Sequence, residues 1–149
     1  MNEIRPWLYI GDYNDTQNKN LLDRNSIQSV LQLSAPVKLP GINLLYIPVK
    51  DLSPISVEHF KQGTDFILAE KNKGNKILVA CAAGVNRSAT FCVAALQEAE
   101  GLSLIEAFKA VRASRTIAMP QEFAWESLCR YYKEDVPYIE LLRISAQYL

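Results

Sequence analysis

Short apolar runs alternate with longer amphipathic stretches along this 149-residue chain. Short apolar runs bounded by turn residues are typical of buried strands. They occur at residues 7–10, 27–33, 44–47 and 77–80, and we expect the first of them to stop at Gly11. The run at 77–80 is apolar throughout, which favours a central strand covered on both faces.

Amphipathic stretches between these runs predict helices. A modest helix is expected over residues 14–25, and a longer one opens at residues 53–56, where Ser and Pro residues precede an apolar periodicity. The strand at 77–80 is followed by a loop and by a helix over residues 89–100, which Gly101 ends.

The rest of the chain predicts further helices. Ser103 and Glu106 have the spacing of a capping box, and Pro120 suits the first position of another helix. Residues 136–149 form a last helix packed on the domain or, alternatively, the surface of a homodimer. The large apolar residues of that segment are Tyr138, Ile139, Leu141, Leu142, Ile144, Tyr148 and Leu149.

The order of these elements predicts an α/β fold. Strands that alternate with helices, followed by a run of helices, indicate a single twisted, mostly parallel central sheet with helices on both faces. The length suits one domain spanning residues 1–149. In such folds ligands bind at the carboxyl ends of the strands, so the end of the run at 77–80 is the first place to look for a site.

Composition narrows the range of partners. Sixteen basic and sixteen acidic residues leave no net charge, which argues against nucleic-acid and membrane partners. We find neither a secretory signal nor an apolar run long enough to span a bilayer. Cys81, Cys92 and Cys129 are too widely spaced for a disulfide framework or a zinc site. We therefore expect a cytoplasmic protein, in which a thiolate persists.

The segment after the central run has the composition of an anion-binding loop. Five mostly small residues separate Cys81 from Arg87, and a helix follows at once. Backbone N–H groups of such a loop converge on a tetrahedral dianion at the helix N-terminus. Arg87 adds a planar fork that matches two phosphate oxygens. The same positive field favours the thiolate of Cys81, which makes it a nucleophile toward the bound phosphoryl group.

Phosphoryl transfer to Cys81 also needs a proton donor for the leaving group. Asp51 is the candidate, because it follows the apolar run at 44–47 and precedes a helix. The thirty residues between Asp51 and Cys81 allow the chain to return to the same edge of the sheet.

The stretch 79–90 resembles the phosphate-binding loop of the dual-specificity phosphatases, a branch of the cysteine-dependent protein-tyrosine phosphatases. That pattern is His-Cys, five residues, Arg and then Ser or Thr. Residues 8–11, 27–33, 48–51 and 101–123 also resemble the family, so the likeness covers nearly the whole chain.

The resemblance implies a phosphomonoester hydrolase that removes phosphate from Tyr and from Ser or Thr of proteins or peptides. Cys81 would be the nucleophile, Asp51 the general acid and then the base, and Ser88 the donor that stabilises the departing thiolate. No metal or other cofactor is implied. The phosphate would be held by the backbone N–H groups of Ala82, Ala83, Gly84, Val85, Asn86 and Arg87, together with the Arg87 guanidinium.

Three positions depart from that pattern or leave alternatives open. Ala80 stands in place of the histidine before the cysteine, so we expect a looser loop, a smaller thiolate fraction and a slower enzyme. The same residue motivates an alternative: a pseudophosphatase that binds phosphorylated partners without turnover. Asn86 resembles the RNA 5′-triphosphatase branch, a second alternative. Gln121 replaces an asparagine and alters local hydrogen bonding.

Overall fold

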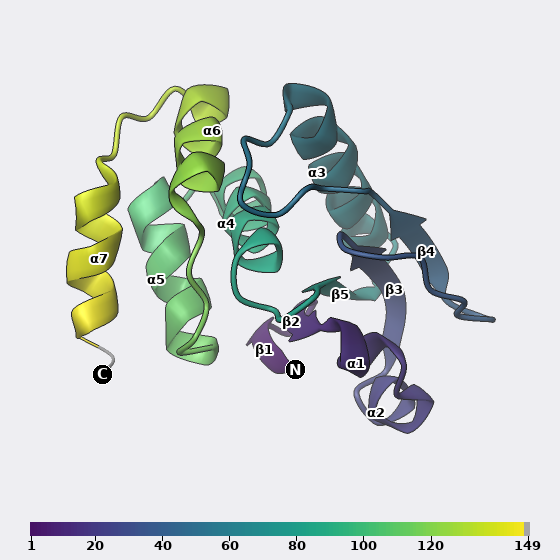
Figure 1. Cartoon of the computed structure of the whole chain (residues 1–149). Coiled ribbons are helices and arrows are strands. Elements are labelled where there is room, and N and C mark those ends of the chain that lie inside the picture. The colour runs from purple at the N-terminus through teal and green to yellow at the C-terminus, as the bar shows by residue number, and fades with distance from the viewer. Residues whose placement is uncertain (148–149) are drawn as a thin grey trace.

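The computed structural model describes residues 1–147 and folds them into a five-stranded sheet with helices on both faces (Figure 1). The strand order is β1-β2-β5-β3-β4; β1 pairs antiparallel with β2, and the other pairs are parallel. The predicted α/β class with a mostly parallel sheet is confirmed. The strands are β1 (Asn2–Arg5), β2 (Leu8–Asp12), β3 (Ile27–Gln32), β4 (Asn43–Tyr46) and β5 (Lys76–Cys81).

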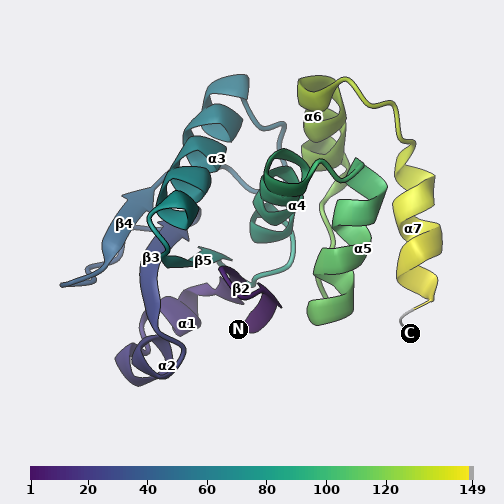
Figure 2. The ribbon, with the colours of Figure 1, turned by 180° about the vertical axis from the view of Figure 1, so that it is seen from behind.

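Two unequal helical layers cover the sheet. The two short helices lie on one face, whereas α3 and α4 pack on the other, and α5, α6 and α7 lie beyond α4 (Figures 1 and 2). No helix within residues 1–147 is long and apolar enough to cross a bilayer. The helices are α1 (Tyr13–Thr16), α2 (Lys19–Arg24), α3 (Val57–Asn72), α4 (Arg87–Glu100), α5 (Leu104–Ser114), α6 (Glu122–Tyr132) and α7 (Tyr138–Ala146).

Several predicted boundaries are wrong for local reasons. The single helix expected over residues 14–25 is two helices, because the Asn18 side chain accepts the Leu21 N–H and starts α2 anew. Strand β2 runs through Gly11 instead of stopping there, and a Cβ on Gly11 would lie 2.5 Å from Asp15 Oδ2. Helix α6 begins two residues after Pro120, with Gln121 as its N-cap.

The core is centred on β5 and α4. The α4 residues from Ser88 to Leu96 are buried without exception, and Cys92 among them is inaccessible. Burial raises the pKa of the Cys92 thiol. A Cβ on Gly63 of α3 would lie 2.4 Å from the Phe91 ring, so glycine allows α3 to pack closely on α4. The start of α4, where the candidate loop ends, is therefore held rigidly.

The capping box predicted at Ser103 and Glu106 is present at the start of α5. The predicted last helix also forms, as α7, with Leu141 and Ile144 buried and contacts to α5 and α6. Two apolar side chains on its outer side, Ile139 and Leu142, are about half exposed. Tyr148 and Leu149 lie outside the described residues. A homodimer through this helix stays a prediction.

A buried carboxylate joins α3 to the sheet. Glu70 is 2% exposed and accepts hydrogen bonds from Ser29 Oγ on β3 and Asn43 Nδ2 on β4, each at 2.7 Å. Lys73 Nζ lies 2.7 Å from its second oxygen. Burial alone would raise the pKa of Glu70, but the bonds from Lys73, Ser29 and Asn43 outweigh it and lower the pKa to about 2.

We predict that Glu70→Gln lowers the free energy of unfolding at pH 7 by about 1–3 kcal/mol, because a buried charge-assisted network is broken. Since the folded-state pKa is depressed, this stabilisation is present above pH 4.5 and is lost as the pH falls toward about 2. Urea unfolding at pH 7, 4 and 3 measures both effects.

The matched control is Asp65→Asn, because Asp65 is 60% exposed and forms an i,i+4 pair with Lys61. That change should lower the free energy of unfolding by less than about 0.5 kcal/mol. If wild type and Glu70→Gln lost stability equally between pH 4.5 and 3, the network would not be the stabilising contact.

Candidate active site

Cys81 is the last residue of β5 and Arg87 the first residue of α4, so the loop between them lies at the carboxyl edge of the sheet. A hollow of about 380 Å³ opens there. Cys81, Arg87 and Asp51 all line it, as do Ala82, Ala83, Val85 and Asn86 of the loop. Leu52, Met119, Gln121 and Tyr138 complete the lining. Of the predicted site residues, Gly84 and Ser88 are buried and do not line it.

The carbonyl oxygens of residues 82–86 are all held by hydrogen bonds. The donors are the N–H of Tyr13 for Ala82, Arg115 Nη2 for Ala83, Arg115 Nε for Gly84, the N–H of Met119 for Val85 and Thr90 for Asn86, at 2.7–3.2 Å. No peptide bond in residues 1–147 is cis. In a trans peptide the N–H points opposite to the preceding C=O. The N–H groups of residues 83–87 therefore point away from these donors, the orientation that an anion-binding nest requires.

Arg115 is the largest single support of the loop. Besides Ala83 and Gly84, its guanidinium binds Asn2 Oδ1 at 2.8 Å, which ties the loop to β1 as well. Arg115 lies in the segment 101–123, which resembles the family, but the sequence indicates no role for it. No local pattern indicates it, because its acceptors are backbone carbonyls some thirty residues earlier.

Gly84 is required by the close packing around it. Its φ is +67°, which favours glycine, and an added Cβ would lie 2.6 Å from Arg115 Nη2 and 2.7 Å from the carbonyl oxygen of Gly11. Any side chain at this position would push the loop away from both β2 and Arg115.

Cys81 and Ser88 are in direct contact. Cys81 is 2% exposed, and its sulfur lies 3.2 Å from the Ser88 hydroxyl oxygen. The thiol donates to that hydroxyl, and after deprotonation the hydroxyl can donate to the sulfur instead. The N-terminus of the 14-residue helix α4 lies next to this pair and favours negative charge there.

Arg87 is buried, and only part of its hydrogen-bond donors have acceptors in the described part of the protein. Its Nη1 donates to the carbonyl oxygen of Val49 at 3.0 Å and, more weakly, to that of Leu33 at 3.5 Å. Among the described residues its buried Nε has no hydrogen-bond acceptor. Asp51 Oδ1 is 3.7 Å from this nitrogen, close enough for charge attraction but too far for a hydrogen bond.

Asn86 connects the acid to the loop, a role that the sequence did not indicate. Its side-chain amide donates to Asp51 Oδ1 at 2.7 Å, and its oxygen accepts the N–H of Gln121 at 2.6 Å. The Asp51 side chain is half exposed, at the mouth of the hollow. Next to it, Leu52 has a φ of +54°, a strained conformation for leucine.

Ala80 lies on the opposite face of the sheet from Cys81. It is fully buried in a small cluster with Tyr9 and Leu78. Its partner on β3 is Gln32, whose buried amide contacts Thr16 Oγ1 at 3.4 Å and accepts the Ser34 N–H at 2.9 Å. The effect of this alanine on rate stays a prediction.

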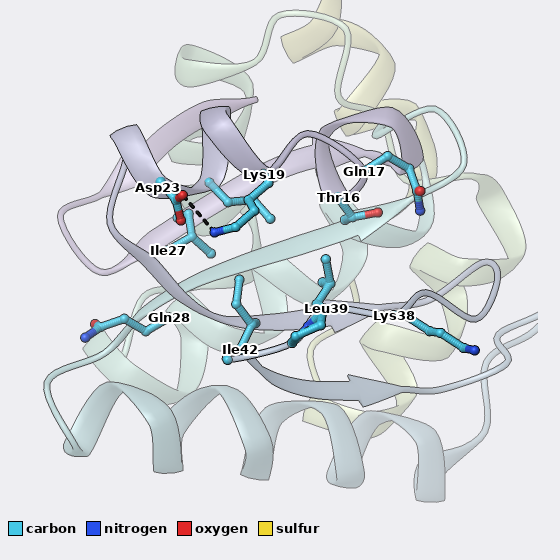
Figure 3. Close-up of a pocket in the computed structure, with 12 residues that line it drawn as sticks. Thr16, Gln17, Lys19, Asp23, Ile27, Gln28, Lys38, Leu39 and Ile42 are labelled. Atoms are coloured by element: carbon cyan, nitrogen blue, oxygen red, sulfur yellow. Dashed lines mark hydrogen bonds and ion pairs between the residues drawn. The ribbon is translucent and has the colours of Figure 1, made fainter.

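A second hollow, of about 400 Å³, lies between α2 and residues 38–42, on the face of the sheet that the short helices cover (Figure 3). Ile27, Leu39 and Ile42 form its apolar part, and Lys19 pairs with Asp23 at its edge. Its lining contains no cysteine, histidine or arginine. This second hollow therefore has no nucleophile beside an arginine, whereas Cys81, Arg87 and Asp51 meet in the first hollow.

Comparison with known proteins agrees with this geometry. The sequence model of a family described as dual specificity phosphatase, catalytic domain, matches residues 8–134. The chain is 37% identical over 140 residues to dual specificity protein phosphatase 22 of Xenopus tropicalis. That alignment covers 91% of this chain and 66% of the relative, so the chain spans slightly less than two thirds of its length.

Solved structures are similar over most of the chain. The crystal structure of human DUSP28 has a TM-score of 0.83 and 27% identity, covering 89% of this chain and 96% of that one. The crystal structure of DUSP15 has a TM-score of 0.80 and 28% identity, covering 98% and 92%.

We predict that Gly84→Ala weakens anion binding by the loop, because the new Cβ would collide with Arg115 and the β2 backbone. The dissociation constant for inorganic phosphate, measured by calorimetry, should rise more than about tenfold, since each 1.4 kcal/mol of lost contact is a factor of ten.

Gly74→Ala is the matched control. Gly74 has a φ of +82°, but no atom lies within 4 Å of its added Cβ, so only backbone strain is introduced. Equal phosphate affinity in both variants would contradict the role of close packing at Gly84.

Proposed function

Because the chain belongs to the dual specificity phosphatase catalytic-domain family, we propose that it hydrolyses phosphomonoesters through a phosphocysteine intermediate. One observation carries the proposal. The buried Nε–H of Arg87 has no hydrogen-bond acceptor among residues 1–147 and lies beside a loop of inward N–H groups. Leaving such a donor unmet costs about 1–3 kcal/mol, and a phosphoryl oxygen in the hollow would satisfy it.

In the first step the phosphate occupies the loop, where the backbone N–H groups and Arg87 balance its charge. The Cys81 thiolate attacks phosphorus, and the S–P bond forms as the bond from phosphorus to the leaving oxygen breaks. Asp51 gives its proton to that oxygen. Asn86 holds Asp51 Oδ1, which leaves Oδ2 as the oxygen that carries the proton.

In the second step a water molecule attacks the phosphocysteine. Asp51, now a carboxylate, removes a proton from the water, and the S–P bond breaks to release inorganic phosphate. The Ser88 hydroxyl, 3.2 Å from the sulfur, donates to the departing thiolate. Neither step calls for a metal or another cofactor.

The substrate we propose is a phosphorylated protein or peptide, with phosphate on Tyr or on Ser or Thr. In this proposal residues 1–149 belong to a single catalytic domain. A free Cys81 thiol supports action in a reducing, cytoplasmic compartment. A phospho-binding module without turnover and an RNA 5′-triphosphatase remain the alternatives, motivated by Ala80 and Asn86.

We expect the wild-type chain to hydrolyse para-nitrophenyl phosphate and Cys81→Ser to be inactive, with a rate at least about 10³-fold lower, because the variant lacks its nucleophile. A panel of phosphotyrosine, phosphoserine and phosphothreonine peptides and an RNA 5′-triphosphate identifies the substrate class. Binding of phosphopeptides without turnover would favour the binding module, and equal activity in Cys81→Ser would refute the nucleophile.

The bond from Asn86 to Asp51 predicts a dependence on the leaving group. Asn86→Ala should lower kcat by about 10-fold or more for an alkyl phosphate, whose leaving oxygen needs the proton, but much less for para-nitrophenyl phosphate. Asp51→Asn should show the same pattern more strongly. Steady-state kinetics on both substrates checks this, and an equal loss on both would mean that Asn86 acts on the loop instead.

A further inference from the structure

The catalytic hollow has a polar floor and an apolar wall. Cys81 and Arg87 belong to the floor, whereas Leu52, Met119 and Tyr138 supply large apolar groups to the lining. Tyr138 is the first residue of α7, and α7 begins after residue 134, where the match to the family domain ends. Part of the wall is therefore contributed by a helix outside the matched catalytic segment.

The Tyr138 ring is held in one position. Its hydroxyl donates to the carbonyl oxygen of Pro120 at 2.7 Å, and the ring is partly buried. Val136, two residues before Tyr138, is also held, because its carbonyl oxygen accepts the Trp125 indole N–H at 2.8 Å. Since the side chain is already ordered, a ligand that packs against it pays little further conformational entropy.

Helix α7 also contacts the segment that supports the phosphate loop. The Ser145 hydroxyl lies 3.1 Å from the Met119 sulfur, and the Met119 N–H donates to the carbonyl oxygen of Val85 at 2.8 Å. The position of the ring is thus coupled to that of the loop through Met119, as well as through Pro120.

We propose that Tyr138 is a specificity-determining residue whose ring packs against the aromatic ring of a phosphotyrosine substrate. This rests on the proposed phosphatase function. Once the phosphate lies on the polar floor, the group attached to it meets the apolar wall. A phenyl ring gains offset or edge contacts with another aromatic ring, which the short aliphatic side chain of phosphothreonine does not offer. The wall therefore favours phosphotyrosine among the substrates that the floor admits.

The test compares kcat/KM for two peptides that differ only in carrying phosphotyrosine or phosphothreonine. In Tyr138→Ala we expect the phosphotyrosine to phosphothreonine ratio to fall by about tenfold, within the range of aromatic pairing energies, chiefly through KM for phosphotyrosine. Tyr138→Phe keeps the ring and should keep most of the preference, although its hydrogen bond to Pro120 is lost.

Ile139→Ala is the matched control, because Ile139 is the next residue of α7 and is 50% exposed. It should leave the ratio unchanged. An unchanged ratio in Tyr138→Ala would overturn the proposal and show that the ring only supports the fold. If Tyr138→Ala does not fold, Tyr138→Leu replaces it in the test, because leucine keeps apolar volume without a ring. An undiminished preference for phosphotyrosine in Tyr138→Leu would overturn the proposal, and a reduced preference would support it.

The failure of the two proposals can be distinguished. A folded wild-type chain that hydrolyses neither peptide would refute the phosphatase function, and the specificity role with it. An active wild-type enzyme whose ratio does not respond to Tyr138 would refute the specificity role alone.

Discussion

Hydrogen bonds that hold the carbonyl oxygens of residues 82–86 outward are the constraint on which the site depends. A carbonyl oxygen turned inward would repel a phosphate, whereas a ring of N–H groups attracts one. The donors are Tyr13 at the start of α1, Thr90 in α4, Arg115 after α5 and Met119 before α6. The loop therefore takes this shape only when the sheet and the later helices are assembled. Anion binding is in this sense a property of the whole fold.

Local features of the site could be predicted from the sequence, and long-range ones could not. The apolar run before Cys81, the small residues of the loop and the capping box at Ser103 each depend on neighbouring residues, and the structure contains all of them. The contacts of Arg115 with Gly84 and of Asn86 with Asp51 join residues 31 and 35 positions apart. Their partners are a backbone carbonyl and a half-exposed carboxylate, which leave no pattern in the sequence.

The same difference between local features and long-range contacts applies to the prediction of the fold. Strand β1 was not expected, because the sequence Asn-Glu-Ile-Arg has little strand propensity; it forms by pairing with β2 at the edge of the sheet. The sequence indicates Gly11 as the end of a strand, although its missing side chain instead permits the close approach of Asp15. A glycine that terminates an element and one that allows close packing look alike until the partner is known.

Ala80 does not leave the loop backbone without support. The loop carbonyls accept hydrogen bonds from Arg115, Tyr13 and Met119 in a chain that has alanine at position 80. The polar floor thus lies within the segment that matches the family. Tyr138 comes from the helix beyond that segment and lines the same hollow. In the proposed function the loop would hold the phosphate and Tyr138 would contact the group attached to it.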